Sequence, residues 1–188
     1  VSMTITLWVA GRVLDRRRFV DYGFRFNRAW WMDLGFGLAL GLLLMAGIFV
    51  VQLIFGWLTI ESTFVTPSGI PFVVAFAVAF LRFVGVGIYE EMLSRGYHLL
   101  NIAEGMNFAF VTSRQAVLLG WGLSSAIFGL LHATNPNATV LSTLNIVVAG
   151  LMLGLPFVLT RSLAIPIGLH IAWNFAQGNI FGFPVSGT

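Results

Sequence analysis

Residues 72–88 read FVVAFAVAFLRFVGVGI, and Arg82 is the only charged residue among them. A run of this length and hydrophobicity is typical of a helix that crosses a membrane. The polar residues Tyr89, Glu90 and Glu91 follow directly, but the helical pattern continues toward Leu100. We therefore expect one long membrane-spanning helix that carries two adjacent carboxylates.

The rest of the chain is also strongly hydrophobic and poor in charged residues. Its 188 residues are 58% hydrophobic and 9% charged, with a mean hydropathy of +0.92, whereas a soluble domain is about 25% charged. These polar side chains are too few to cover a soluble globule. At roughly 20 residues per span, the chain has room for about five membrane-spanning helices. We therefore predict an integral, multi-pass membrane protein.

Short polar joints separate the apolar runs of the chain. The fold class that we predict is all-α, a polytopic transmembrane helix bundle with about five full spans and a truncated N-terminal helix. The expected spans are residues 34–58, 72–100, 116–132, 140–159 and 165–177. We expect the glycines within them to allow close approach of neighbouring helices: Gly41, Gly47, Gly150, Gly154 and Gly168.

Residues 1–33 differ from the remainder, because a short apolar stretch is followed by many arginines and aromatic residues. A secretory signal peptide carries its charge before the apolar stretch, not after it. We interpret residues 1–33 as the tail of an upstream helix and a cytoplasmic juxtamembrane segment, although a solvated connector fits equally well. Residues 34–188 form the expected membrane domain, incomplete at its C-terminus. The short loops favour a prokaryotic cell membrane.

Two features of the composition exclude whole classes of function. The chain has no cysteine, which rules out disulfides, thiolate nucleophiles, cysteine-ligated zinc and palmitoyl anchors. The pI of about 10.2 comes from ten basic residues, all of them arginine, and they form no face able to follow a phosphate backbone. We therefore expect the lipid bilayer, and no nucleic acid, as a partner.

Ionisable groups inside a span are costly, so the polar end of the long helix calls for a function. Glu91 and Arg95 are four residues apart, with the glutamate first, which is the favourable order for an ion pair on one helix face. Glu90 lies about 100° around the helix. The pattern fits one structural carboxylate beside a second that is free for proton chemistry, but it fits a polar clamp to a neighbouring helix about as well.

Two later helices carry further polar groups. His132 ends the span 116–132, and Phe128 lies one turn earlier on the same face. His170 and Asn174 are four residues apart in the last span, so their side chains project from one face. Taken singly, each is explained by a helix cap or by a hydrogen bond between helices.

The combination of these groups points to hydrolysis. Glu90 would deprotonate a water, His132 would orient or carry the proton, and His170 with Asn174 would stabilise an oxyanion. Glu90, His132 and His170 are equally the ligand set of a catalytic zinc with an open fourth position, in which case Glu91 could be the base. The residues leave both assignments open, so no cofactor is favoured and zinc is the one cofactor considered.

Three motifs occur in an order that resembles a known family. Residues 90–97, EEMLSRGY, resemble an EExxxR motif, residues 128–132, FGLLH, an FxxxH motif, and residues 170–174, HIAWN, an HxxxN/D motif. This ordered set resembles the CPBP family, also called the ABI domain family. Its members include CAAX prenyl proteases of type 2 and bacteriocin-processing or self-immunity intramembrane proteases. The resemblance covers about residues 85–184.

The resemblance implies an intramembrane endopeptidase whose substrate is a peptide or protein, either prenylated or a small bacteriocin-like peptide. Carried over residue by residue, it makes Glu90 the activator of water with help from His132, and His170 and Asn174 the oxyanion site. Glu91 and Arg95 support that site. The family includes both metal-dependent and metal-independent descriptions, and we favour the metal-independent one because Glu91 is expected to pair with Arg95.

Three alternatives remain open at this stage. The first is a zinc-dependent version of the same hydrolysis, and the second is a non-catalytic immunity or interaction protein on the same scaffold. The third and least favoured is a small proton-coupled carrier. Such carriers show internal repeats and broken helices, and we find no repeat in this chain.

Overall fold

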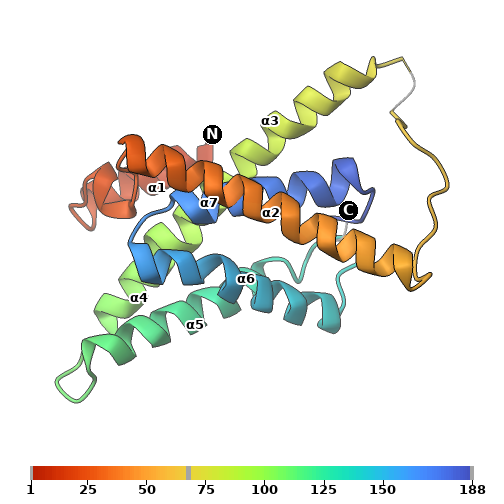
Figure 1. Cartoon of the computed structure of the whole chain (residues 1–188). Coiled ribbons are helices and arrows are strands. Elements are labelled where there is room, and N and C mark those ends of the chain that lie inside the picture. Colours follow the sequence, from red (N-terminus) through yellow and green to blue (C-terminus); the bar gives the residue numbers. More distant parts are fainter. Residues whose placement is uncertain (1, 67–68, 187–188) are drawn as a thin grey trace.

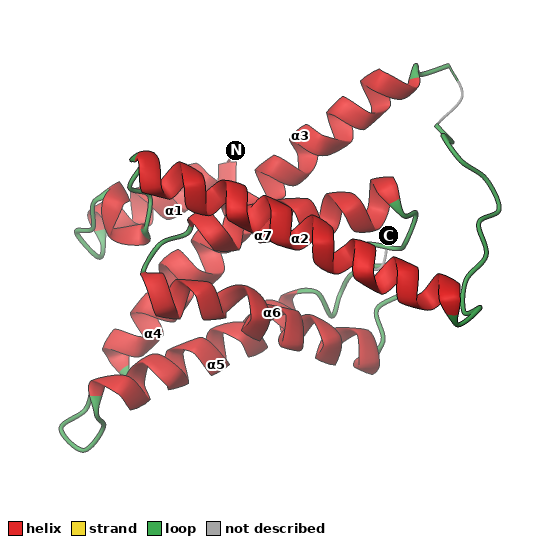
Figure 2. Cartoon of the chain, in the orientation of Figure 1, coloured by secondary structure: helices red, strands yellow, loops and turns green. Residues whose placement is uncertain are grey.

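A computed structural model describes residues 2–66 and 69–186. Every regular element within these residues is a helix (Figure 2), which confirms the predicted all-α fold. In chain order the α-helices are α1 (Ser2–Val13), α2 (Arg28–Ile54), α3 (Phe72–Glu91), α4 (Leu100–Gly105), α5 (Ser113–Leu131), α6 (Val140–Thr160) and α7 (Ala164–Phe175).

Among the described residues, four helices are long and apolar enough to cross a membrane. These candidate spans are Arg28–Ile54, Phe72–Gly105, Ser113–Leu131 and Val140–Thr160. The fifth expected span is α7, which has 12 residues and continues as a short π-helix, η3 (Ala176–Ile180). Most of α7 is buried, and it packs on α2, α3 and α6 (Figure 1). Its apolar residues therefore serve the interior of the bundle.

The second span is one continuous helical rod. α3 passes directly into a π-helix, η2 (Met92–Leu99), and then into α4, giving 34 residues from Phe72 to Gly105. This length places Glu90 near the middle of the rod. Figure 1 shows the first turns of α3 standing apart from α2, while Phe76 and Phe80 contact the ring of Phe175 at the end of α7.

Polar side chains at the helix starts explain where two spans begin. Asn27 accepts a hydrogen bond from the backbone N–H of Trp30 at 2.9 Å, so α2 begins before the apolar run that predicted it. Thr112 and Gln115 form a capping box that starts α5 at Ser113. Because of these caps, both helices begin earlier in the sequence than expected: α2 at Arg28 instead of residue 34, and α5 at Ser113 instead of residue 116.

Glycines allow α2 and α7 to pack closely. A Cβ atom added at Gly41 would lie 2.6 Å from the carbonyl oxygen of Leu169, and one at Gly168 would meet the backbone of Leu34. The expected close approach is therefore confirmed at these positions, and also at Gly150 and Gly154. It is wrong for Gly47, where nothing lies within 4 Å, because this residue faces away from the contact with α7.

The arginine-rich segment between α1 and α2 packs against the second span. Arg17 donates to Glu104 at 2.6 Å, and Asn101 donates to Asp15 at 3.2 Å. Burial raises the pKa of Tyr22, which belongs to the short 3₁₀-helix η1 (Phe19–Tyr22). Contacts of this segment therefore hold the C-terminal end of the second span.

Candidate active site

Glu91 and Arg95 form the expected ion pair, and it is fully buried. Arg95 Nη1 lies 3.1 Å from Glu91 Oε1, and the two side chains are 1% and 0% exposed. Arg95 Nη2 also donates to the carbonyl oxygen of Gly150 on α6 at 2.7 Å, and its guanidinium lies 4.8 Å from the centre of the Phe128 ring. A buried pair is stable only when its remaining groups are also satisfied, and these contacts satisfy Arg95.

Glu91 also holds the imidazole of His170. His170 Nδ1 lies 2.7 Å from Glu91 Oε1, and an ionised carboxylate only accepts hydrogen bonds, so Nδ1 is the donor. The contact joins α3 to α7 and fixes the ring of His170. Its other nitrogen, Nε2, is therefore directed away from Glu91 and toward Glu90.

His132 is oriented in a comparable way from a third helix. It is the C-terminal cap residue of α5, and its Nδ1 lies 2.7 Å from the backbone carbonyl oxygen of Phe128. Because a carbonyl oxygen only accepts, Nδ1 carries the hydrogen. In the neutral ring, Nε2 then presents a lone pair toward Glu90.

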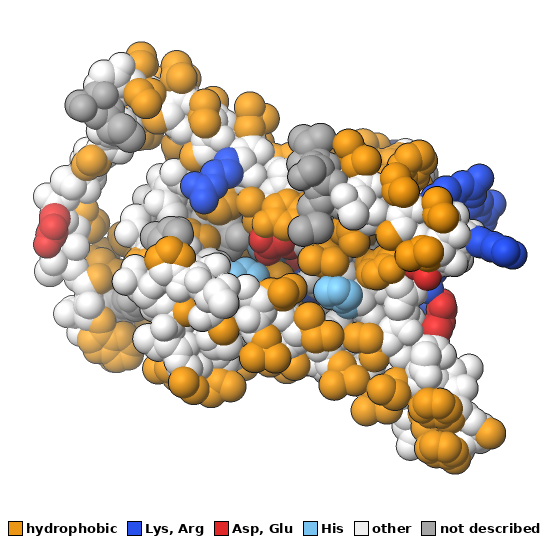
Figure 3. All heavy atoms as spheres, turned by 180° about the vertical axis from the view of Figure 1, so that it is seen from behind, with side chains coloured by type: hydrophobic (Ala, Val, Ile, Leu, Met, Phe, Trp, Pro, Cys, Tyr) orange, Lys and Arg blue, Asp and Glu red, His pale blue; other side chains and the backbone are white. Residues whose placement is uncertain are grey.

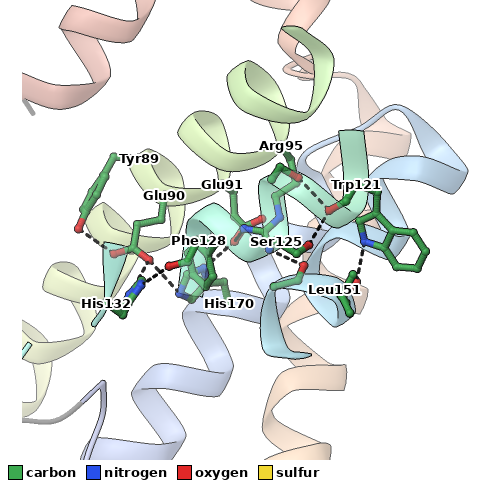
Figure 4. Close-up of polar contacts among 12 residues, drawn as sticks. Tyr89, Glu90, Glu91, Arg95, Trp121, Ser125, Phe128, His132, Leu151 and His170 are labelled. Atoms are coloured by element: carbon green, nitrogen blue, oxygen red, sulfur yellow. Dashed lines mark hydrogen bonds and ion pairs between the residues drawn. The ribbon is translucent and has the colours of Figure 1, made fainter. Parts of the chain in front are cut away.

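Glu90 lies where the two imidazoles meet, as Figure 4 shows. Its Oε2 is 3.9 Å from His132 Nε2 and 3.7 Å from His170 Nε2. Its Oε1 accepts a hydrogen bond from the hydroxyl of Tyr89 at 2.8 Å. The two longer distances exceed a direct hydrogen bond, but a water beside them can bond to Glu90 and an imidazole at about 2.8 Å.

These groups border a cavity of about 840 Å³ whose walls include Glu90, His132 and Asn174. A smaller cavity of about 240 Å³ adjoins it and is lined by His132, His170 and Asn174. The amide of Asn174 makes no hydrogen bond to any other residue in the described part of the chain. Figure 3 shows acidic and histidine side chains together near the middle of a largely apolar face.

The sequence-predicted residues thus fall into two groups. Glu90, His132 and His170 meet around one carboxylate oxygen, and Asn174 shares cavity walls with them. Glu91 and Arg95 lie behind His170, out of contact with solvent. The long second helix brings Glu90 to the end of α5, which places Glu90 and His132 at the same depth despite their different positions in their helices.

Glu90, His132 and His170 are also the kinds of side chain that a catalytic zinc would need. No group of three His, Asp or Glu side chains in residues 2–66 and 69–186 is arranged to hold a metal ion. Tetrahedral zinc holds neighbouring ligand atoms about 3.4 Å apart, so Glu90 would have to approach both imidazoles by a few tenths of an ångström. The bonds from each Nδ1 to a carboxylate or carbonyl are of the kind that orients zinc-binding histidines. As they stand, the three side chains do not form a zinc site, and zinc binding would require Glu90 to move toward both imidazoles.

Sequence reasoning missed three contributors to this site. Tyr89 donates a hydrogen bond to Glu90, and the only indication of this role in the sequence was its position next to the motif. Phe128 was expected only as a motif residue, yet its carbonyl orients His132 and its ring packs 6.1 Å from the ring of His170. Gly150 contributes a backbone carbonyl to Arg95, and a backbone group of this kind leaves no signal in sequence.

A comparison with protein families places more than half of the chain within a known family. A protein-family model described as Rce1-like, type II CAAX prenyl endopeptidase Rce1-like, matches residues 71–176. The matched range contains every predicted site residue. No curated protein and no solved structure matches the chain.

Proposed function

Because this chain belongs to the Rce1-like family of type II CAAX prenyl endopeptidases, we propose that it cleaves a peptide bond with a water activated by Glu90. The family and the apolar helices make it an integral membrane protein, and the family implies an intramembrane endopeptidase. The chemical roles of individual residues, the substrate and a prokaryotic location are our proposal.

The convergence of both Nε2 atoms on Glu90 Oε2 is the observation that carries this proposal. Three helices that are far apart in sequence direct these groups to one point, where Glu90 and His132 line the large cavity and His170 lines the smaller one. A purely structural clamp would close such groups into direct hydrogen bonds, as Glu91 does with Arg95 and His170. Glu90 is instead 14% exposed and can be reached from the cavity.

The proposed reaction begins with a water held between Glu90 and His132. Glu90 takes a proton from this water as its oxygen bonds to the peptide carbonyl carbon. The peptide C–N bond then breaks, and the proton passes to the leaving nitrogen, so that a carboxylic acid and an amine result. His132 accepts a hydrogen bond from the water through Nε2 and keeps its oxygen aimed at the carbonyl.

His170 and Asn174 would stabilise the negative charge that develops on the carbonyl oxygen. Asn174 can donate from its amide, which lies on the cavity wall. His170 Nδ1 already donates to Glu91, so donation from Nε2 requires the ring to carry both protons. The proposal therefore assigns His170 a doubly protonated state during the reaction.

The cavity also fits the proposed substrate class. Its walls are largely apolar, with residues such as Val78, Phe83 and Val86 from α3. An apolar groove that reaches a carboxylate suits a peptide attached to a prenyl chain. A bacteriocin-like apolar peptide would suit it as well.

The proposal is tested with the purified protein in liposomes and a peptide that ends in an S-farnesylated CAAX sequence. Mass spectrometry should detect one cut within the CAAX box. Absence of any cut, with the protein folded, would favour the non-catalytic alternative. A cut that requires added zinc would favour the metal-dependent one.

A further inference from the structure

Arg82 is a charged residue that the proposed mechanism does not use. It lies within the apolar part of α3, and its side chain lines the same cavity as Glu90. Arg82 makes no hydrogen bond or ion pair with another residue of the described chain. Its guanidinium carbon lies 5.8 Å from the centre of the Phe83 ring, and its charge also acts electrostatically on Tyr89, which lines the same cavity. An intramembrane cation without a partner is expensive and is by default a functional residue.

Its distance from the start of the helix makes a lipid headgroup a poor partner. Arg82 is ten residues from Phe72, where α3 begins, which corresponds to about 15 Å of helix. Arginines that reach headgroups by extending their side chains lie near helix ends. Among the residues that line the cavity, Arg82 and Glu90 are the two with formal charges. Figure 3 shows a basic side chain on the same face as the acidic and histidine groups, apart from the basic cluster at one edge.

The spacing between Arg82 and Glu90 suggests what the cation binds. Glu90 follows Arg82 by eight residues, or about 12 Å along the helix. In a CAAX box, at most three residues separate any bond after the cysteine from the C-terminal carboxylate. Three extended residues span about 10 Å. A peptide lying along α3 with its scissile bond at Glu90 would therefore bring its carboxylate within reach of the guanidinium.

We propose that Arg82 binds the C-terminal carboxylate of the peptide substrate and thereby selects chains that end near the scissile bond. A guanidinium pairs with a carboxylate through two parallel hydrogen bonds, which fixes direction as well as position. The assignment rests on the proposed function, because it uses Glu90 as the point of cleavage. It makes the protein specific for free C-termini, and internal sequences would bind poorly.

The test measures binding apart from cleavage. In an uncleaving Glu90→Gln background, fluorescence anisotropy compares a labelled S-farnesylated CAAX peptide with a free carboxylate to the same peptide with a C-terminal amide. The acid should bind at least about tenfold more tightly. Arg82→Gln should remove this preference, and Arg82→Lys should keep part of it. Arg114→Gln is the matched control, since Arg114 is exposed and lies outside the cavity.

Each outcome supports or overturns the assignment of Arg82 to the substrate carboxylate. Equal binding of acid and amide, or no saturable binding of either, overturns the proposal. A preference that persists in Arg82→Gln also overturns it, and loss of anionic-lipid binding in that variant would assign Arg82 to lipid phosphate. A preference for the acid that depends on Arg82, together with a wild-type protein that does not cleave the peptide, would support this inference while contradicting the proposed hydrolysis.

Discussion

Glu91 accepts a hydrogen bond from Nδ1 of His170 at 2.7 Å, and this contact ties the second membrane span to α7. The same oxygen of Glu91 accepts from Arg95 at 3.1 Å. Of two neighbouring carboxylates, Glu91 is therefore buried and accepts two hydrogen bonds through Oε1, whereas Glu90 faces the cavity. Glu91 therefore has a structural role, and Glu90 is the carboxylate that is free to meet a substrate.

Replacing Glu91 with Gln should destabilise the protein strongly. The change leaves Arg95 buried without its counter-charge, and loss of one partner from such a pair typically costs about 3–5 kcal/mol. Thermal unfolding in detergent should show the loss. Glu104→Gln is the control, because the Glu104 side chain is 70% exposed and its pair with Arg17 should contribute less than about 1 kcal/mol. Equal stability of the two variants would contradict the assigned role of Glu91.

Replacing Tyr89 with Phe should slow cleavage without weakening substrate binding. The hydroxyl of Tyr89 donates to Glu90 at 2.8 Å and holds the carboxylate in place, so its loss should lower kcat by about tenfold and leave KM unchanged. Tyr97→Phe removes a hydroxyl from the same span at a position that does not line the cavity. An increase in KM at constant kcat would instead assign Tyr89 to substrate binding.

Helix packing predicts opposite outcomes for two glycines of α2. Gly41→Ala should cost about 1–3 kcal/mol, because the new methyl group would press on the backbone of Leu169. Gly47→Ala should be neutral or stabilising by up to about 1 kcal/mol, because the methyl group meets nothing within 4 Å and alanine favours the helix. Melting temperatures of the two variants check this directly. A more stable Gly41→Ala would show that α2 and α7 are not packed as described.

Metal removal separates the two hydrolytic mechanisms. If water is activated by Glu90 and His132 alone, dialysis against a strong chelator should leave the cleavage rate unchanged. If zinc binds Glu90, His132 and His170, activity should fall by orders of magnitude and return on adding zinc. Elemental analysis of the purified protein gives a second readout that does not depend on the substrate.

Hydropathy and spacing were sufficient to predict much of the fold. Long apolar runs located the spans, and the four-residue spacing of Glu91 and Arg95 predicted their ion pair, because both properties depend on local sequence alone. The burial of α7 was not predictable in this way. The sequence does not distinguish an apolar side chain such as Leu169 that faces protein from one that faces lipid. For the same reason, the prediction that Gly47 lies at a helix contact was wrong.

The site was predictable only in part. The ordered motifs named the residues, and the structure brings Glu90, His132 and His170 together, although their catalytic roles stay a prediction. The local helix geometry around the site was not predicted, because local sequence does not encode it. Two of the three motif-bearing helices widen to π-helices, at Met92–Leu99 directly after Glu91 and at Ala176–Ile180 shortly after Asn174, as is frequent at functional sites.

The most direct test of the central claim is the cleavage rate of Glu90→Gln, measured on an S-farnesylated CAAX peptide against the wild-type protein. The substitution keeps the shape of the side chain and removes its ability to take a proton. We predict a loss of at least about 100-fold with normal folding and binding, as expected when a general base is removed. Cleavage within a few-fold of the wild-type rate would contradict the assignment of Glu90 as the residue that activates water.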